Sequence, residues 1–329
     1  MSPADILQAL SGLSALVVGD VCLDRWCRYA PALSDPSRET GIPRIAVVAS
    51  ETTPGAAGTV ASNLKALGVG RVSILGVRGD DGNGYELMQA LARRAIDSSA
   101  ILQSAELPTF TYTKLINDTN SVEDKPRVDF VYTGDIPPAV ETAVVQRLNQ
   151  LAPEFDVIIV SDQAETESGG LVTAKVREAL TAIAAQDPGK IIWVDSRRRG
   201  ALYRNVLVKL NEQEAEESCL AYFGQLDYQA LRQRIGYPTL IVTQGPKGAV
   251  IVGEQSTKTI QTTPVEHPVD ICGAGDSFNA GASVALALTR DPAKAVEFGN
   301  LVASITIMKP GTGTASPEEV LAASAALQK

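Results

Sequence analysis

The sequence predicts an α/β fold in which a mostly parallel central sheet is covered by helices on both faces, with a small β-sheet added to it. From residue 139 onward, short apolar segments of strand length alternate with helical segments, which is typical of crossovers between parallel strands. In the N-terminal half, four extended segments do not follow this alternation, so we expect them to form a separate sheet. With 329 residues, of which 45% are hydrophobic, the chain can bury the core that this fold needs.

The N-terminal elements follow from apolar runs and their boundaries. The run at residues 15–18 predicts a buried first strand that ends at Gly19-Asp20, with Asp24 in the loop that follows. Gly68 predicts the end of a helix over residues 59–67. The other elements expected in this half are strands at 26–29, 44–50, 71–75, 109–116 and 127–132, and a helix at 84–94.

We expect one main domain, residues 1–329, because no linker rich in Pro, Gly and Ser and no internal repeat divides the chain. The extended segments within residues 25–52 and 108–133 then form a lid, which could also be a dimer surface.

Active sites of such folds lie at the carboxyl ends of the strands. The elements expected in the C-terminal half are helices at 139–151 and 280–288 and strands at 157–160, 191–194, 206–210 and 239–243.

Composition excludes several classes of protein. The formal net charge is -9, with 29 basic against 38 acidic residues, which argues against a nucleic-acid partner. The four cysteines show no metal-ligand spacing, and the single histidine, His267, excludes a His-rich metal site. There is no signal-peptide pattern and no apolar stretch of about 18 residues. We therefore expect a cytoplasmic protein with reduced thiols and no membrane partner.

Residues 269–281 carry the strongest functional signal. Gly273 and Gly275 flank Ala274, and Asp276 follows at once, ahead of a run of small residues. Glycines let successive N–H groups point the same way, and the first turn of a helix has free N–H groups, so this turn can bind a phosphate or a developing oxyanion. Asp276 could accept a proton from a hydroxyl group held beside that phosphate. The alternative is that Asp276 merely caps the helix and the glycines form an ordinary loop.

Asp270-x-x-Gly273-Ala274-Gly275-Asp276 resembles the C-terminal signature of the ribokinase-like, or PfkB, carbohydrate kinases. The resemblance implies a three-layer α/β/α sandwich with a mostly parallel sheet and a β-sheet lid. It also implies ATP and Mg²⁺ as cofactors, Asp276 as the catalytic base, and an anion hole formed by the preceding backbone. The chain has neither a P-loop nor a dinucleotide-binding glycine motif after the first strand, so any nucleotide is held in another way, as it is in this family.

Two further segments resemble the ion-binding parts of this family. Asn211 and Glu214, which follow Lys209, match its N-x-x-E element, so the resemblance implies that they organise Mg²⁺ and phosphate, through water. Read without the resemblance, the same two residues predict a helix N-cap and its capping-box partner. The loop that begins at Gly311 resembles the one that, with Asp270, shapes a monovalent-cation site, which implies potassium there.

Two more segments resemble the nucleotide side. Thr243, Gly245 and Gly248 match a T-x-G-x-x-G strand and turn that lies beside the nucleotide. A hairpin between strands at 240–242 and 249–252 would need the same glycines, so this match alone is weak. Asn300 lies where family members line the adenine pocket, although a lone helical Asn is more often structural.

The sugar side resembles one branch of the family, the kinases of the ADP-heptose pathway. Asp24, Gly55, Asn63 and Arg127 match this branch, in which D-glycero-β-D-manno-heptose 7-phosphate is phosphorylated at its anomeric oxygen. By this resemblance Asp24 is the main acceptor-binding residue and Asn63 helps to orient the sugar. Thr59 stands where the branch has an asparagine, so its hydrogen bonds to the sugar must differ.

A phosphorylated acceptor needs a cationic partner, and several cations fall in or beside the lid segments. Each could equally be a solvated surface charge. The triplet Arg197-Arg198-Arg199 could face phosphates or solvent. Other sugars or nucleosides, or a catalytically idle sugar- or nucleotide-binding protein, remain alternatives, and relatives imply a homodimer through the lid. The lid cations are Arg25, Arg28, Arg38, Arg44, Lys125 and Arg127.

Overall fold

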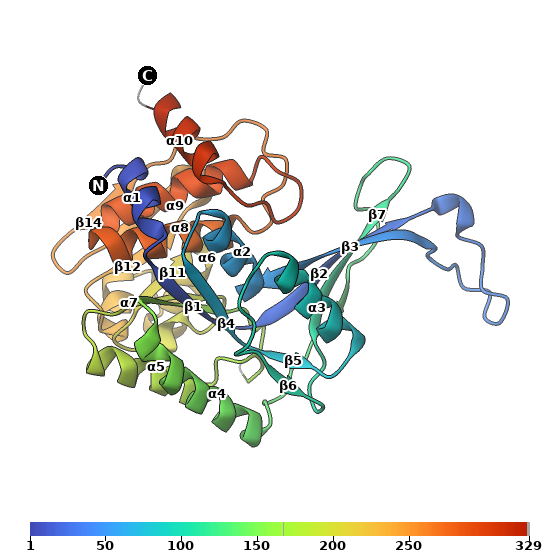
Figure 1. Ribbon diagram of the computed structural model, residues 1–329, viewed down its shortest axis with the longest axis horizontal. Coiled ribbons are helices and arrows are strands. Elements are labelled where there is room, and N and C mark those ends of the chain that lie inside the picture. Colours follow the sequence, from blue (N-terminus) through green and yellow to red (C-terminus); the bar gives the residue numbers. More distant parts are fainter. Residues whose placement is uncertain (167, 328–329) are drawn as a thin grey trace.

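The structure is a computed structural model that describes residues 1–166 and 168–327. Within them, the main sheet is eight-stranded (Figure 1). Its strands, in spatial order, are β14 (Thr257–Ile260), β13 (Ala249–Val252), β12 (Leu240–Thr243), β11 (Leu207–Asn211), β10 (Ile191–Ser196), β9 (Val157–Asp162), β1 (Ser14–Gly19) and β4 (Arg71–Leu75).

The pairing from β4 through β12 is parallel, and β13 and β14 complete the sheet as antiparallel strands. The sequence predicts the parallel part, with strand ends shifted by one or two residues. Because parallel strands share a carboxyl edge, Gly19, Asp162, Ser196, Asn211 and Thr243 end along one side of the sheet. This is the edge at which ligands bind in open α/β sheets.

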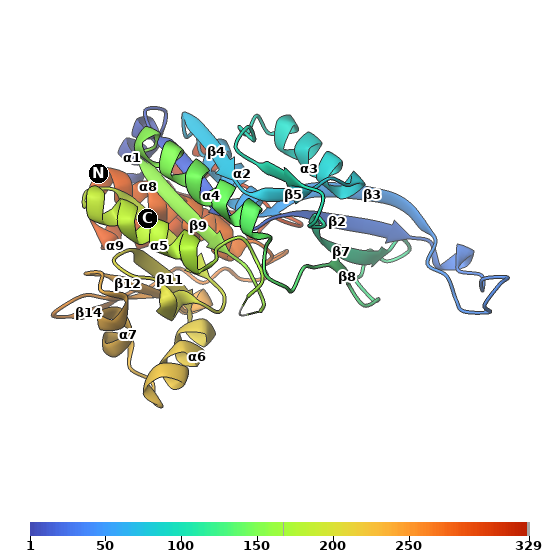
Figure 2. The same cartoon turned by 90° about the horizontal axis from the view of Figure 1, so that it is seen from below.

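Helices cover both faces of this sheet (Figures 1 and 2). One face packs against α1, α2, α8, α9 and α10, and the other against α4, α5, α6 and α7. None of the helices in the described ranges has the length and apolar character needed to cross a membrane. The helices are α1 (Pro3–Leu10), α2 (Ala57–Ala66), α3 (Gly82–Arg93), α4 (Pro138–Leu151), α5 (Ala174–Gln186), α6 (Glu212–Phe223), α7 (Tyr228–Ile235), α8 (Ala274–Thr289), α9 (Pro292–Thr306) and α10 (Pro317–Ala326).

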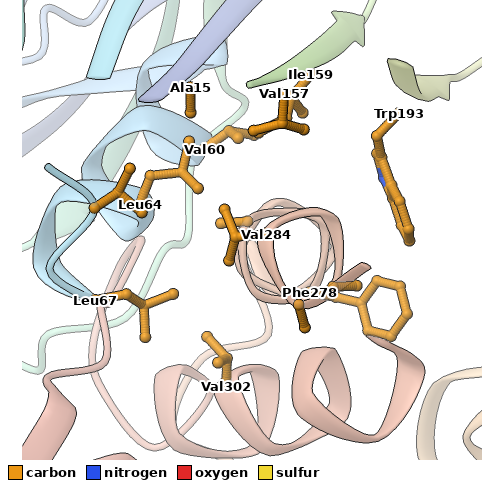
Figure 3. Packing of buried hydrophobic residues seen from close by; sticks show 14 of the residues in the cluster. Ala15, Val60, Leu64, Leu67, Val157, Ile159, Trp193, Phe278, Val284 and Val302 are labelled. Carbon is orange, nitrogen blue, oxygen red and sulfur yellow. The ribbon is translucent and has the colours of Figure 1, made fainter. Parts of the chain in front are cut away.

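The alternation of side chains along the buried strands creates two cores. Ala15, Val157 and Ile159 point to the α8 face, where they meet α2 and α8 (Figure 3). Their sequence neighbours, such as Leu16 and Ile158, point to the α4 and α5 face. Both sets are fully buried, which is why these strands are continuous apolar runs. α8 lies within one core along much of its length, and its first turn reaches the carboxyl edge of the sheet.

A second sheet of four strands stands beside the main one, in the order β3 (Val47–Ala56), β2 (Val21–Tyr29), β7 (Phe110–Asn117) and β8 (Val128–Phe130). A short parallel pair, β5 (Val77–Gly79) and β6 (Leu102–Ser104), forms a third, two-stranded sheet. The predicted small sheet is therefore present, and β2, β3 and β7 project away from the body of the protein (Figure 1). The prediction for Asp24 was wrong, because β2 starts five residues earlier than expected, at Val21, and places Asp24 on a strand.

Candidate active site

A cavity of about 140 Å³ lies between the second sheet and the start of α8. Asp24 and Trp26 on β2 and Tyr112 and Lys114 on β7 line it from the sheet side. These residues share a face because side chains alternate along a strand and β2 pairs with β7 in parallel, with Asp24 beside Tyr112 and Trp26 beside Lys114. We call this space the acceptor cavity. Asp276 lines it from α8, so the structure brings two predicted carboxylates to one cavity.

The turn before α8 has the geometry expected of an anion site. Gly273 is the N-cap residue of α8, with a φ of 76°, and it lines the acceptor cavity. A β-carbon there would lie 3.2 Å from Thr312 and 3.3 Å from Thr59, in a backbone conformation that side chains disfavour. No side chain caps this helix. Among the first N–H groups of α8, that of Ala274 donates to the Ile271 carbonyl oxygen at 3.2 Å, while those of Gly275 and Asp276 have no acceptor among the described residues, so the turn can bind an anion.

Asp276 lies in the first turn of α8 but does not cap it. Its carboxylate makes no hydrogen bond to any described residue, and the capping alternative is therefore wrong. Burial, with the negative charge of Asp195 as the next cause, raises the pKa of Asp276 to about 8, against the opposing effect of Lys209. A carboxylate with this pKa is a stronger base than an exposed one once it is deprotonated, and a pKa close to the working pH suits a general base.

Lys209 is buried beside the same turn. Its Nζ lies 3.1 Å from Asp195 Oδ1, and a β-carbon at Gly275 would lie 3.7 Å from it. Burial alone would lower the pKa of Lys209, but Asp195 above all, together with Glu214 and Asp276, outweighs that effect and the pKa is raised. A permanent positive charge is therefore held below the N–H groups at the start of α8.

Asp195 belongs to a hydrogen-bond chain that sequence analysis missed. Asn279 Nδ2 donates to Asp195 Oδ2 at 2.6 Å, and Trp193 Nε1 donates to Asn279 Oδ1 at 3.0 Å. Trp193 and Asn279 are fully buried, so the chain fixes the Asp195 carboxylate and, through it, Lys209. The signal in the sequence is a lone Asp at the end of an apolar strand, which is too common to single out.

A second, open cavity lies at the ends of β10 and β11. Arg197 and Arg198 line it with Asn211 and Glu214. Asn211 Oδ1 accepts from the Glu214 N–H at 2.8 Å, and Glu214 Oε2 accepts from the Asn211 N–H at 2.7 Å. The capping box predicted as the alternative is therefore formed. Burial, followed by the charge of Asp195, raises the pKa of Glu214 to about 7. We call this space the donor cavity.

The other predicted nucleotide residues lie on separate elements. Thr243 ends β12, and Gly245 and Gly248 flank the turn into β13, so the predicted hairpin is present at this position. Asn300 lies on α9, and its Nδ2 is buried without a hydrogen-bond partner among the described residues. Neither the hairpin residues nor Asn300 line the acceptor or the donor cavity.

The structure brings together some of the predicted sugar residues and separates others. Gly55 pairs with Cys22 across β2 and β3, and a β-carbon on it would overlap the Asp24 carboxylate. Burial raises the pKa of Asp24 to about 6. Asn63 is completely buried and donates to the Thr59 carbonyl oxygen at 3.0 Å. Asn63 does not line the acceptor cavity. It lies on α2 one helical turn after Thr59, and its side chain is buried inside the protein.

Of the predicted lid cations, Arg127 alone lines the acceptor cavity. Its guanidinium pairs with Asp129 at 2.7 Å and lies over the Tyr112 ring at 5.1 Å. Lys114, which sequence analysis missed, is the second lid cation there, because β7 places it on the same face as Tyr112. The other five do not line this cavity; among them, Arg25 pairs with Glu86, Arg28 with Asp118, and Lys125 lies over the Tyr29 ring.

The arginine triplet after β10 is divided among three environments. Arg199 is buried and ion-paired with Asp162, so the expectation that it faces phosphates or solvent was wrong. The half-exposed Arg197 pairs with Glu165 at 2.8 Å, and Arg198 donates to the Glu165 carbonyl oxygen at 2.9 Å. Single residues two positions apart can thus have opposite burial where the chain leaves a strand.

Asp270 joins the two loops that were predicted to hold a monovalent cation. One carboxylate oxygen accepts from the Cys272 N–H at 2.9 Å, and the other accepts from the Gly311 N–H at 3.1 Å. This carboxylate therefore connects the anion turn before α8 with the loop before α10. Among the described residues there is no cluster of three or more His, Cys, Asp or Glu side chains that could hold a metal by themselves.

The chain is similar to solved structures of sugar kinases over nearly its whole length. Phosphofructokinase-2 from Escherichia coli in complex with potassium has a TM-score of 0.72 at 19% identity, covering 96% of this chain and 100% of that one. Ribokinase from Arabidopsis thaliana, complexed with ribose and ATP, has a TM-score of 0.68 at 17% identity, covering 95% and 98%. These similarities show the ribokinase-like fold that the sequence predicts.

Sequence comparisons give the family. Bifunctional protein HldE from Caulobacter sp. is 31% identical over 333 residues, which cover 97% of this chain and 64% of that protein. The HldE protein from Methylococcus capsulatus is 32% identical over 324 residues, covering 96% and 64%. This chain therefore spans less than two thirds of the length of these relatives. The family model described as pfkB family carbohydrate kinase matches residues 21–319. The chain belongs to the pfkB family of carbohydrate kinases.

Proposed function

We propose that the protein transfers the γ-phosphoryl group of ATP to a sugar phosphate, with D-glycero-β-D-manno-heptose 7-phosphate as the preferred acceptor and its anomeric hydroxyl as the nucleophile. The observation that carries this proposal is the acceptor cavity, in which two carboxylates, Asp24 and Asp276, face two cations, Lys114 and Arg127. Carboxylates suit sugar hydroxyl groups, and cations suit a remote phosphate. The HldE relatives support the heptose. We also propose a cytoplasmic location, because ATP is supplied in that compartment.

In the proposed mechanism, Asp24 accepts hydrogen bonds from the sugar and holds it against the start of α8. Asp276 accepts the proton of the attacking hydroxyl group, and the N–H groups of residues 273–275 donate to the phosphoryl oxygens. Lys209 places positive charge beneath that turn. Because the transition state of phosphoryl transfer is loose, positioning and charge stabilisation contribute more than base strength.

The oxygen-rich edge of the donor cavity fits Mg²⁺, since Asn211 and Glu214 offer an amide and a carboxylate oxygen. Both already bond to backbone N–H groups, so we propose that they reach the ion through water. A bound Mg²⁺ would neutralise charge on the ATP phosphates. We propose the Asp270 carboxylate and the Gly311 loop as a potassium site, because an ion there would stabilise the anion turn. Thr243, Gly245, Gly248 and Asn300 are proposed to contact the nucleotide.

The acceptor can be identified by its phosphate. Lys114→Met and Arg127→Met should each raise the KM for heptose 7-phosphate by about 10–100-fold, because a hydrogen bond to a charged group contributes about 1.5–3 kcal/mol. The same variants should change the KM for an unphosphorylated sugar little. The assay is ADP release across a panel of heptose 7-phosphate, hexose phosphates, free sugars and nucleosides.

Lys125→Met is the matched control, because Lys125 belongs to the lid but lies over the Tyr29 ring, away from the cavity. It should leave the KM unchanged. If turnover is confined to a free sugar or a nucleoside, or if both lid variants leave the KM for the sugar phosphate unaltered, the proposal is wrong.

We also propose a homodimer through the lid. Val128 and Phe130 on β8 are half-exposed, and their strand positions place them on the face opposite Tyr112 and Lys114. Val47 on β3 is also exposed. Apolar side chains gathered on one projecting sheet are typical of an interface. Sedimentation should show a dimer, and Phe130→Asp should shift it toward monomer; a wild-type monomer at micromolar concentration would contradict the proposal.

A further inference from the structure

Arg197 lies where the acceptor and donor cavities meet. It follows the end of β10, and its backbone N–H donates to the Asp162 carbonyl oxygen at 3.1 Å, which fixes the start of its side chain. Among the described residues, Arg197 is the one that lines both cavities, with Asp276 in the first and Glu214 in the second. A phosphoryl group transferred between these two cavities would therefore move close to this side chain.

Negative charge gathers where the two cavities meet, and a cation on the solvent side of this junction would offset it. Asp24, Asp276 and Glu214 are carboxylates that face the two cavities, and the phosphoryl group adds further negative charge. Lys209 is buried beside the turn before α8 and held by Asp195, so its positive charge acts on the phosphoryl group only from the buried side of that turn. Arg197 is near enough to lower the pKa of Asp276 and of Glu214, after burial and the Asp195 and Lys209 charges. It supplies positive charge from the other side.

The present partner of Arg197 can be exchanged. Arg197 Nη1 lies 2.8 Å from Glu165 Oε1, and the two side chains are 45% and 56% exposed. An exposed ion pair of this kind contributes only about 0–1 kcal/mol. A phosphoryl group offers the guanidinium two oxygens in a geometry that favours bidentate binding. Glu165 therefore positions the arginine without holding it strongly.

We propose that Arg197 is a catalytic residue that contacts the oxygens of the γ-phosphoryl group during its transfer, an inference that rests on the proposed function. In this step the sugar oxygen forms a bond to the γ-phosphorus while the bond from that phosphorus to the bridging oxygen of ADP breaks. The hydroxyl proton moves to Asp276, and ADP leaves with the electron pair of the broken bond. Arg197 makes its bidentate contact in the transition state, where the charge on the phosphoryl oxygens is spread between the two cavities.

The decisive comparison is between Arg197→Gln and a matched variant remote from both cavities. Arg71 forms an equally exposed ion pair with Glu154, at 3.0 Å with exposures of 47% and 51%, and lines neither cavity. Arg197→Gln should lower kcat by about 10²–10³-fold, the range for loss of one donor to a developing charge, with a smaller change in the KM for either substrate. Arg71→Gln should leave kcat unaltered. Guanidinium in the buffer should restore part of the activity of Arg197→Gly.

A second measurement needs no acceptor. Calorimetry should show that Arg197→Gln weakens binding of ADP with fluoroaluminate, a mimic of the transferring phosphoryl group, while binding of ADP alone is retained. This arm tests Arg197 even if heptose 7-phosphate is the wrong acceptor, which the wild-type panel decides separately. Equal loss of ADP and ADP–fluoroaluminate binding, a rise in the acceptor KM with normal kcat, or normal kcat in Arg197→Gln would each overturn the inference.

Discussion

Replacing Asp276 by Asn should lower kcat by about 10²–10⁴-fold, the usual contribution of a general base, while ATP binding is retained. The carboxylate lines the acceptor cavity, caps nothing, and has no hydrogen-bond partner among the described residues. Asn has the same shape but cannot accept the proton of the attacking hydroxyl group. The measurements are steady-state ADP release and ATP titration by calorimetry.

The same substitution should make the protein more stable at alkaline pH. Because burial, then Asp195, raises the pKa of Asp276 from 3.8 to about 8, the folded protein binds this proton more tightly than the unfolded chain. Its contribution to stability is therefore present below pH 3.8 and is lost as the pH rises to about 8. An asparagine side chain cannot ionise, so the Tm of the Asp276→Asn variant should exceed that of the wild type at pH 8.5. Activity of the wild type should rise with pH across the same range.

Asp291→Asn is a suitable control, because Asp291 caps α9, the next helix, and accepts from the N–H groups of Ala293 and Lys294. It should keep normal turnover and gain no stability at alkaline pH. Near-normal turnover of Asp276→Asn would remove Asp276 from the mechanism. A lower Tm at pH 8.5 would instead show that its carboxylate supports the fold.

Local sequence patterns were sufficient to predict the turn before α8, because its glycines, its aspartate and the helix that follows are contiguous. They were insufficient for Lys114, which reaches the acceptor cavity only because β7 pairs with β2 across about ninety residues of chain. They also gave no indication that Asn63 is buried, since a polar residue on a helix gives no sign of which face is turned into the core. Residues whose positions depend on register or on helix rotation cannot be assigned from neighbours in the sequence.

Asp195 is a second example of a residue that cannot be assigned from its neighbours in the sequence. Its role comes from three partners on separate elements: Lys209 on β11, Asn279 on α8 and, through Asn279, Trp193 on its own strand. Packing α8 against β10 creates this chain of hydrogen bonds. Each member is ordinary as a residue type. Only the tertiary structure shows that this chain of hydrogen bonds ends at Lys209, beside the turn before α8.

Lys209→Met should lower kcat by about 10²–10³-fold through loss of the positive charge beneath that turn. It should also leave three carboxylates, Asp195, Glu214 and Asp276, without their shared buried cation. Lys209 lowers the pKa of Asp276 in the wild type, so its removal should move the alkaline rise in activity to higher pH. Breaking a buried pair by removing one partner costs about 3–5 kcal/mol of stability, so the Tm should fall as well.

Lost stability and lost catalysis can be separated with two further variants. Lys190 is a largely buried lysine at the opposite end of β10, with a side chain 9% exposed against 5% for Lys209, and its Nζ donates to the carbonyl oxygens of Ala152 and Phe155. Lys190→Met should lower the Tm but not shift the pH profile. In Lys209→Met/Asp195→Asn no unpaired buried charge is left from the pair, so stability should partly return while kcat stays low. If kcat recovers together with stability, the role of Lys209 is structural only. A positive charge that acts on the phosphoryl group cannot be replaced by neutralising Asp195.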